Sequence, residues 1–232
     1  MIQFSEIFDL AVNLFDDPDI RQMYVGDPVG FQQSMRPYLI KGKEEFTHPI
    51  AIADKLAAYS APRGSLEEFD GDGSAVYSLS TTPVDGSVFT YRVNGEIVLG
   101  GSYDALSGKV TFPEPVPVGT ACSVAWYYAG AFTADFTDLG FRGDYKVSGI
   151  MSKIMNILAT SVAVAWSLNE MNRALEFRNI LSDADLSFYS PANSAQAKTE
   201  WHKAVQREMD SLEAQLNWRI YATPVGGSRF GK

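Results

Sequence analysis

The sequence predicts an α+β protein: a helical bundle built from the N- and C-terminal segments, with an inserted small antiparallel β-sandwich or barrel. In both terminal segments apolar residues recur at spacings of three and four, which is typical of amphipathic helices. Between Gly64 and Phe132 the pattern changes to short alternating runs separated by turns rich in glycine and proline. Whole modules are tolerated at exposed loops when the two ends of the module lie close together. We therefore expect a helical domain of residues 1–63 and 133–232, with a β-module at 64–132.

The N-terminal segment predicts several helices and one hairpin. The stretch MIQFSEIFDLAVNLFDD carries an apolar face at helical spacing, and a short helix should follow it with Asp17 as N-cap and Pro18 at its first position. The stretch RPYLIKGKEEF is expected to form a small hairpin that turns at Lys41 and Gly42. A further helix is expected in THPIAIADKLAAYS, with Pro49 in its first turn.

Four runs of alternating residues predict the strands of the β-module: AVYSLS, VFTYRVNG, KVTF and CSVAWYY. The NG pair in the second run predicts a tight hairpin turn. Of the net charge of −9, most falls in this module, which holds two basic and eight acidic residues. An acidic exterior favours solvation and keeps like-charged neighbours apart.

The C-terminal segment predicts two long helices. Helical spacing of apolar residues runs from Ile150 to Leu181, with Ser148 as the candidate N-cap, and it returns in AQAKTEWHKAVQREMDSLEAQLNWRI. The most apolar run, IMNILATSVAVAW, is shorter than the roughly 20 residues that span a bilayer. We expect a buried helix there, and no membrane partner.

Composition and motifs argue against catalytic or metal chemistry. The net charge of −9 argues against a broad phosphate-binding surface. His48 and His202 lie on separate segments without a second ligand at i+3 or i+4, so surface or interface positions are expected. The DGDG stretch begins like a calcium loop, but counting from Asp70 places Thr81 where an EF-hand needs its glutamate, which favours a simple turn. No nucleophile elbow, phosphate loop or dinucleotide motif occurs, so we expect no enzyme, no cofactor and no metal.

The single cysteine, Cys122, stands in a strand pattern without a charged neighbour. A small apolar side chain packs well in such a position, and nothing nearby would lower the pKa of the thiol. We expect a core residue, and one cysteine excludes an intrachain disulfide.

Three adjacent aromatic residues in the last predicted strand form a candidate contact surface. Because side chains alternate along a strand, Trp126 and Tyr128 share one face and Tyr127 takes the other. One face can fill the core, while the other would expose an aromatic ring to a carbohydrate or a protein partner. Trp126 and Tyr128 are the candidate partner-binding residues, and packing of the module against the helical domain is the alternative.

The β-module resembles a unit that recurs in virion proteins of tailed bacteriophages. That unit has the form GDGS-x-x-(Y/F)-x-L-x-x-x-P-V-D-G-S-V-x-V-x-V-N-G, followed by G-x-(V/I)-T-F and P-V-G-x-x-V-x-V-x-Y. The matching residues are Gly71–Ser74, Tyr77, Leu79, Pro83–Val88, Val93–Gly95, Gly108, Val110–Phe112, Pro117–Gly119, Val124 and Tyr127.

The helical remainder resembles the head-to-tail adaptor, or connector, proteins beneath the phage portal. The likeness covers Met1 to about Ile20, where an acidic break separates two helices, and more loosely Ser148–Lys232. It implies a twelve-fold homo-oligomeric ring in the virion neck, made in the host cytoplasm, that joins the portal protein to a tail or tail-terminator protein. Genomic DNA would pass through its channel without sequence-specific binding. The inserted module and the very long third helical region depart from the smaller adaptors.

The resemblance also implies a contact by the C-terminal segment TPVGGSRFGK. In adaptor-like proteins this extension docks on the portal, and here Arg229 and Lys232 offer charges while Phe230 offers an apolar anchor. A frayed terminus is the alternative.

Other classes of function remain open at this point. The same β-unit occurs in other tail, baseplate and fibre-attachment proteins, so a different structural component is the second hypothesis. A carbohydrate-binding module, based on Trp126, Tyr127 and Tyr128, is the third, and a hydrolase has the least support.

Overall fold

The computed structural model describes the backbone of residues 1–15, 17–134, 144–183 and 191–222, and in the two long C-terminal helices the side chains of 149–173, 195–218 and 220. The chain divides into two compact units. The first holds Met1–Pro37 and Ala58–Thr133, and the second holds Tyr38–Ala57 and Ala134–Lys232. Both helices and antiparallel sheets occur, which confirms the α+β class. The first unit joins the expected β-module to the first 37 residues, and the domain division at residues 64–132 stays a prediction.

The helices of the first unit begin where the sequence provides caps. Helix α1 (Phe4–Ala11) follows strand β1 (Ile2–Gln3) and buries its apolar face. Helix α2 (Pro18–Gly26) has Asp17 as its N-cap, with the carboxylate accepting from the Asp19 N–H at 2.9 Å, so this prediction is confirmed. Helix α3 (Pro28–Glu45) starts in the first unit and continues into the second.

The prediction of a hairpin at Lys41 and Gly42 is wrong, because α3 runs through both residues. Gly42 is buried, and a Cβ on it would lie 2.5 Å from the backbone oxygen of Ser161. The glycine therefore allows two helix backbones of the second unit to approach closely, which a turn signal read from sequence does not reveal.

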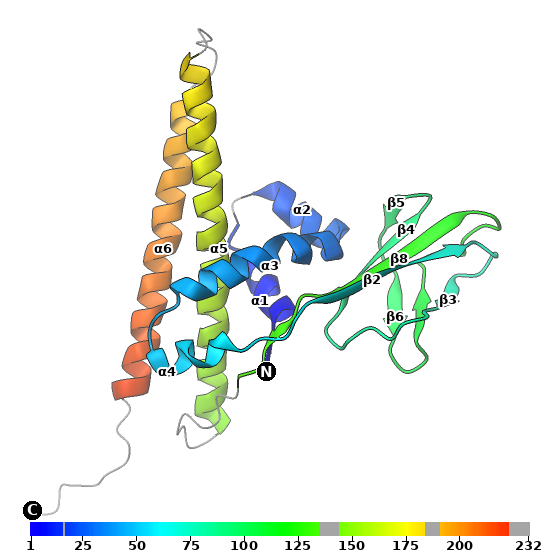
Figure 1. The fold of residues 1–232 in the computed structure, drawn as a ribbon, viewed down its shortest axis with the longest axis horizontal. Coiled ribbons are helices and arrows are strands. Elements are labelled where there is room, and N and C mark those ends of the chain that lie inside the picture. The colour runs from blue at the N-terminus through cyan, green and yellow to red at the C-terminus, as the bar shows by residue number, and fades with distance from the viewer. Residues whose placement is uncertain (16, 135–143, 184–190, 223–232) are drawn as a thin grey trace, which may run out of the picture. The chain divides into compact units, whose positions relative to one another are not determined.

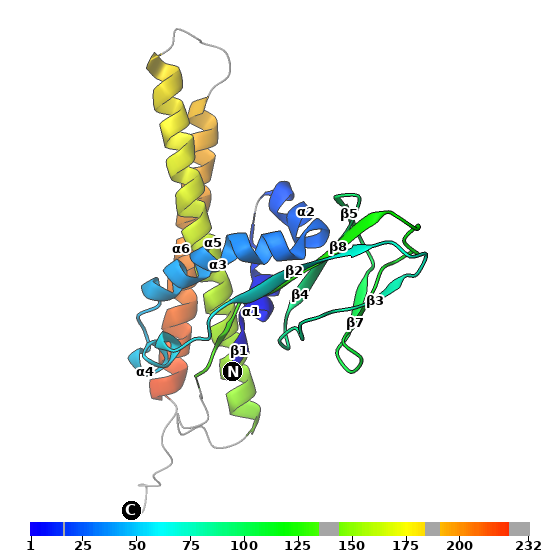
Figure 2. The same ribbon diagram turned by 45° about the vertical axis from the view of Figure 1, so that its right-hand side comes forward.

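The strands of the first unit form two larger antiparallel sheets and one short pair (Figures 1 and 2). The four-stranded sheet has the order β2-β8-β4-β5, the three-stranded sheet has the order β3-β7-β6, and β1 pairs with the last strand. The strand bounds are β2 Arg63–Asp70, β3 Val76–Ser78, β4 Val88–Val93, β5 Glu96–Val98, β6 Ser102–Asp104, β7 Lys109–Thr111, β8 Ala121–Tyr128 and β9 Ala131–Phe132.

A shared apolar core joins the two larger sheets. It contains Tyr77, Tyr91, Val110, Phe112, Val116, Cys122 and Val124. The four predicted runs all contain strands, and the NG turn is confirmed, because Asn94 and Gly95 both have positive φ, at 52° and 81°. Strands β2, β5 and β6 were not predicted.

The second unit contains a helical hairpin and a short helical connection. Helices α5 (Asp144–Asp183) and α6 (Pro191–Ala222) lie side by side along most of their length (Figures 1 and 2). The rings of Trp166 and Trp201 meet edge to face at 5.6 Å, and the hydroxyl of Ser167 lies 2.8 Å from His202 Nδ1. The two long helices were predicted from these stretches, but the prediction of Ser148 as N-cap is wrong, because α5 begins at Asp144 and Ser148 lies inside it.

The helix expected to begin near Pro49 is shorter than the sequence suggests. Helix α4 covers only Ile50–Ala53, with Pro49 at the N-cap position, and a 3₁₀ turn at Lys55–Ala57 follows. In α5, the stretch Gly149–Arg173 is long and apolar enough to cross a membrane by length and composition, with a mean hydropathy of 1.3 in its most apolar 18-residue window. Because 67% of its most apolar window is buried inside the protein, it has the character of a core helix.

Candidate binding site

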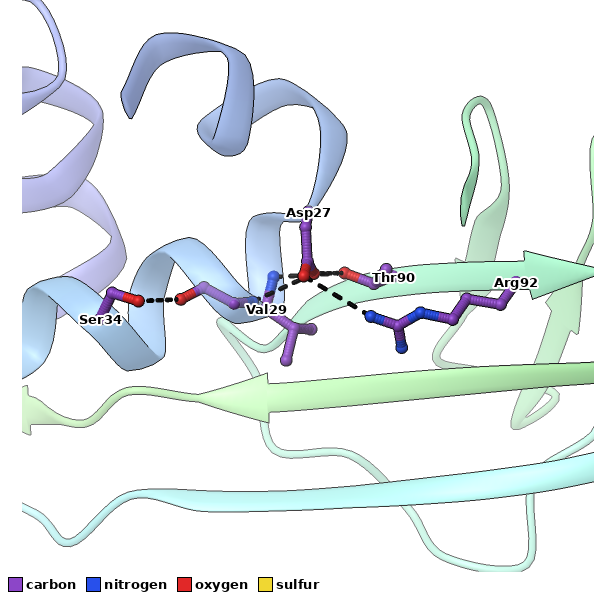
Figure 3. A network of polar contacts seen from close by, with 6 residues as sticks. Asp27, Val29, Ser34, Thr90 and Arg92 are labelled. Carbon is purple, nitrogen blue, oxygen red and sulfur yellow. Dashed lines mark hydrogen bonds and ion pairs between the residues drawn. The ribbon is translucent and has the colours of Figure 1, made fainter. Parts of the chain in front are cut away.

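A network around Asp27 fixes the start of α3 on strand β4. Asp27 Oδ1 accepts a hydrogen bond from Thr90 Oγ1 at 2.7 Å and another from the Gly30 N–H at 3.1 Å, which caps the helix (Figure 3). The Val29 N–H donates to Thr90 Oγ1 at 3.3 Å, and Arg92 Nη2 lies 3.5 Å from Asp27 Oδ2. The Asp27 carboxylate thus accepts from one helix N–H and from the neighbouring strand, and Thr90 accepts from a second helix N–H.

Because the network ties the start of α3 to strand β4, it sets which side chains of α3 lie against the sheet. Beyond the cap, Phe31 and Gln32 are buried, at 0% and 2% exposure. Together with residues from α1, α2, β4 and β6 they line a cavity of about 500 Å³ within the first unit. We call it the aromatic cavity, and its lining residues are Asp9, Tyr24, Val25, Pro28, Phe31, Gln32, Val88, Phe89, Tyr91, Gly101, Ser102 and Tyr103.

Five of the twelve residues that line the aromatic cavity are aromatic. Phe89 stacks on Tyr103 at 4.8 Å with an interplanar angle of 27°, and it stacks on Tyr91 at 6.4 Å and 29°. On the helical side Tyr24 meets Phe31 edge to face at 5.1 Å. Rings packed on one another in this way are held in place, so the wall is largely preformed.

Three oxygen atoms of the lining residues are buried and have no hydrogen-bond partner among the residues that the structure describes. They are Gln32 Oε1 and the hydroxyl oxygens of Tyr91 and Tyr103. Leaving such atoms unpaired costs free energy, roughly 1–3 kcal/mol each. Because no water-sized molecule reaches these atoms, their unpaired state is a cost of packing the side chains and does not mark a ligand position in the cavity.

The lining of the aromatic cavity also includes the carboxylate of Asp9 and the phenol groups of Tyr24 and Tyr91. Both of these phenols stay neutral at physiological pH. The hydroxyl of Tyr24 donates to Asp9 Oδ1 at 2.9 Å. Burial first, and the bond to Asp9 second, raise the pKa of Tyr24 to about 12, and burial raises the pKa of Tyr91 to about 12. No lysine, arginine or histidine is among the described residues that line it. Such a cavity suits a neutral or cationic ligand and not an anion.

The structure places the sequence-predicted contact residues differently from the expectation. Trp126 and Tyr128 are each only 6% exposed, so neither ring faces solvent in the first unit. Tyr128 OH lies 3.1 Å from Ser60 Oγ, and Tyr127 is the more accessible ring of the three. The burial follows from the strand, since the face of β8 that carries Trp126 and Tyr128 also carries the core residues Cys122 and Val124. Arg229, Phe230 and Lys232 lie outside the described residues.

The remaining candidates take structural positions. Cys122 is 4% exposed, and burial raises the pKa of its thiol, as expected for a core residue. His48 is exposed beside Thr47. In the DGDG turn, Asp72 Oδ1 accepts from the Ser74 N–H at 2.8 Å, so the carboxylate shapes the turn. In the part of the chain that the structure describes, no three His, Cys, Asp or Glu side chains are grouped to hold a metal ion.

Sequence reasoning missed the aromatic cavity. Its residues come from five segments, and the one local signal is the alternation of Phe89 and Tyr91 in β4.

No protein-family model, curated protein or solved structure matches this chain.

Proposed function

We propose that this chain is a structural protein of a tailed-bacteriophage particle, a head-to-tail connector. Many copies form a ring that joins the portal to the tail and continues the DNA channel. The proposal includes a finer reading of the fold, in which a helical bundle from both ends of the chain carries the β-module as an insert.

The exposure of Trp218 is the observation that most supports self-association. It lies on α6 and is 71% exposed, whereas Trp166, on the same helical hairpin, is 5% exposed. A large indole left in water is costly, and tryptophan is enriched among residues that anchor protein interfaces. Trp218 is therefore our candidate anchor between neighbouring copies in a ring, where each copy presents one surface and receives another.

The β-containing unit supplies a second type of contact surface. Leu106 and Val118 stand at turns of this unit and are 100% and 80% exposed. Apolar tips on an acidic module suit contacts with a different virion protein, because like charges would keep two such modules apart.

The proposed partners are other copies of the chain, the portal protein and a tail or tail-terminator protein. The basic residues Arg229 and Lys232, with Phe230 between them, are proposed to contact the portal. DNA would pass an acidic channel without binding, since like charge discourages contact with phosphates.

The test is the assembly state of the purified full-length chain. We expect rings by negative-stain electron microscopy at high protein concentration, and a matching mass by light scattering. Trp218→Ser should abolish the rings, whereas Leu106→Ser, a matched loss of an exposed apolar side chain, should leave them intact. A chain that stays monomeric at all concentrations would contradict a self-assembling ring, and straight tubes or fibres would favour the other tail proteins.

A further inference from the structure

We propose that the outer edge of strand β2 binds an extended segment of a partner protein as an added antiparallel strand, with basic residues opposite Glu68 and Asp70. The inference goes beyond the proposed function and holds whether or not the chain forms a ring. It rests on the place of β2 in its sheet, on the side chains of its two faces and on a hollow beside the two acids.

Strand β2 stands at one end of the four-stranded sheet, so it has a neighbouring strand on one side only (Figures 1 and 2). All eight of its residues pair with β8. Because the N–H and C=O groups of successive residues point to alternate edges of a strand, every second residue of β2 directs them away from β8. Among the described residues, no backbone group outside β8 pairs with β2. Such a row of free donors and acceptors is the template on which an extended chain adds a strand.

The outer edge of β2 lacks the features that usually prevent strand addition. The opposite edge of the sheet, β5, has only three residues, whereas β2 has eight. The register with β8 is continuous, without a bulge, and the strand contains no proline. Short edge strands, bulges and prolines are the common means of blocking an edge. The edge of β2 is therefore long and regular enough to hold a partner strand.

One face of β2 is already occupied by the protein itself. Phe69 packs against the apolar core, with its ring 5.1 Å from that of Tyr77. The Glu67 carboxylate accepts from the Ser80 N–H at 2.7 Å and from the Thr81 N–H at 3.1 Å. A partner strand would therefore be recognised through the side chains on the other face of β2.

That other face offers one apolar side chain and two acids. Leu66 is 55% exposed, and Glu68 and Asp70 are exposed as well. In the described part of the chain, no hydrogen bond or salt bridge engages either of these two carboxylates. Both acids are therefore free to pair with basic side chains of a partner.

A hollow of about 420 Å³ adjoins the two acids. Besides Glu68 and Asp70, its lining residues are Phe69, Gly95, Ala121, Cys122 and Ser123. None of these described lining residues is basic. The hollow gives room to the aliphatic stem of a lysine or arginine whose charged end meets the carboxylates.

Cross-strand pairing sets the sequence expected of the partner. Directly opposite residues of antiparallel strands share a face, and opposite charges there stabilise the pair while like charges destabilise it. The partner segment should therefore carry two basic residues at alternate positions, followed two residues later by an apolar residue opposite Leu66. A second copy of the chain is disfavoured, because its own β2 would bring three acids against the same three acids.

The first test measures peptide binding to the full-length protein by calorimetry. The probe is acetyl-Lys-Thr-Lys-Thr-Val-Thr-Ala-Thr-amide, whose lysines would lie opposite Asp70 and Glu68. Its control has glutamate in place of both lysines. We expect the lysine peptide to bind at least about tenfold tighter than the glutamate peptide, and to bind more weakly as salt is raised.

Backbone pairing is tested with two N-methylated forms of the lysine peptide, one methylated at every odd-numbered residue and one at every even-numbered residue. Successive N–H groups point to alternate edges, so one form should bind as the parent does and the other should not bind. Hydrogen exchange followed by NMR should slow at amides of β2 on binding and stay unchanged in β5. Equal binding of both methylated forms would overturn strand addition.

A charge exchange links binding to β2. Glu68→Lys should weaken the lysine peptide by about tenfold and strengthen the glutamate peptide. Glu114→Lys, the same change at an exposed residue outside β2, should alter neither. No binding of the lysine peptide, equal binding of the lysine and glutamate peptides, or tighter binding of acetyl-Arg-Gly-Ser-Leu-Glu-Glu-Phe-Asp-amide, which stands for a second copy, would each overturn the proposal.

Discussion

Glu213 on α6 is a partly buried acid, and one of its carboxylate oxygens lacks a hydrogen-bond partner in the part of the chain that the structure describes. Its Oε1 is buried and makes no hydrogen bond there. Burial first, and the nearby Asp210 second, raise the pKa of its carboxyl from 4.5 to about 7. The protonated form is therefore the one that suits the folded helix pair.

This raised pKa predicts a loss of stability as pH rises. Because the folded pKa lies above the unfolded value, Glu213 contributes stability that is full below pH 4.5 and lost as pH rises through about 7. Glu213→Gln should raise the free energy of unfolding at pH 8 by about 1 kcal/mol, since the partly exposed carboxylate keeps some hydration. Urea unfolding at several pH values measures the effect. Glu208→Gln, exposed on the same helix, is the control, and an equal gain in both variants would contradict the assignment to Glu213.

At the level of elements, Gly42 shows how tertiary packing overrides a local signal. The stretch RPYLIKGKEEF contains proline and glycine, which favour a turn in isolation. In α3 both lie inside one helix, and Gly42 allows the backbone at Ser161 to approach. The partner is more than a hundred residues away in sequence, so no local pattern could reveal it.

Gly42→Ala should destabilise the second unit although alanine favours helix. A Cβ at this position would lie 2.5 Å from the Ser161 oxygen and 2.7 Å from its carbonyl carbon, and both are backbone atoms that cannot move aside easily. We expect a loss of about 1–3 kcal/mol in the free energy of unfolding, measured by chemical denaturation. Gly26→Ala is the control, because nothing lies within 4 Å of its Cβ. A neutral Gly42→Ala would show that the two helices are not in this close contact.

Helices and strands with a strong periodicity of apolar residues could be predicted from the sequence. Elements that form only by pairing with a distant segment of the chain could not. The long helices α5 and α6 and the strands β4 and β8 follow apolar patterns that are visible in sequence. Strand β2, with the sequence RGSLEEFD, is charged and mostly exposed, and it forms because all eight residues pair with β8. The aromatic cavity was missed for the same reason, since Asp9, Gln32 and Tyr103 converge only after the first unit has folded.

At the scale of the whole molecule, an uneven charge distribution is the dominant feature. The chain has 19 basic and 28 acidic residues, and span 64–132 holds eight of those acids and two of the bases. Repulsion among like charges destabilises the compact state, and salt screens it.

Raising the salt concentration should therefore stabilise the protein. Between about 20 mM and about 300 mM potassium chloride we expect the melting temperature to rise by roughly 2–5 °C. Differential scanning calorimetry at pH 8 measures the shift. Sorbitol, which is uncharged, serves as the control for non-ionic effects, and a falling melting temperature would show that attractive ion pairs dominate over repulsion.

Helix α3 contains one of the points at which the chain passes from the first unit to the second. The chain passes between the two units three times, after Pro37, Ala57 and Thr133, and the first of these passages lies inside helix α3. Its weakest turn is at Pro37, which has no N–H to donate. We expect this passage of the chain to bend first at that turn.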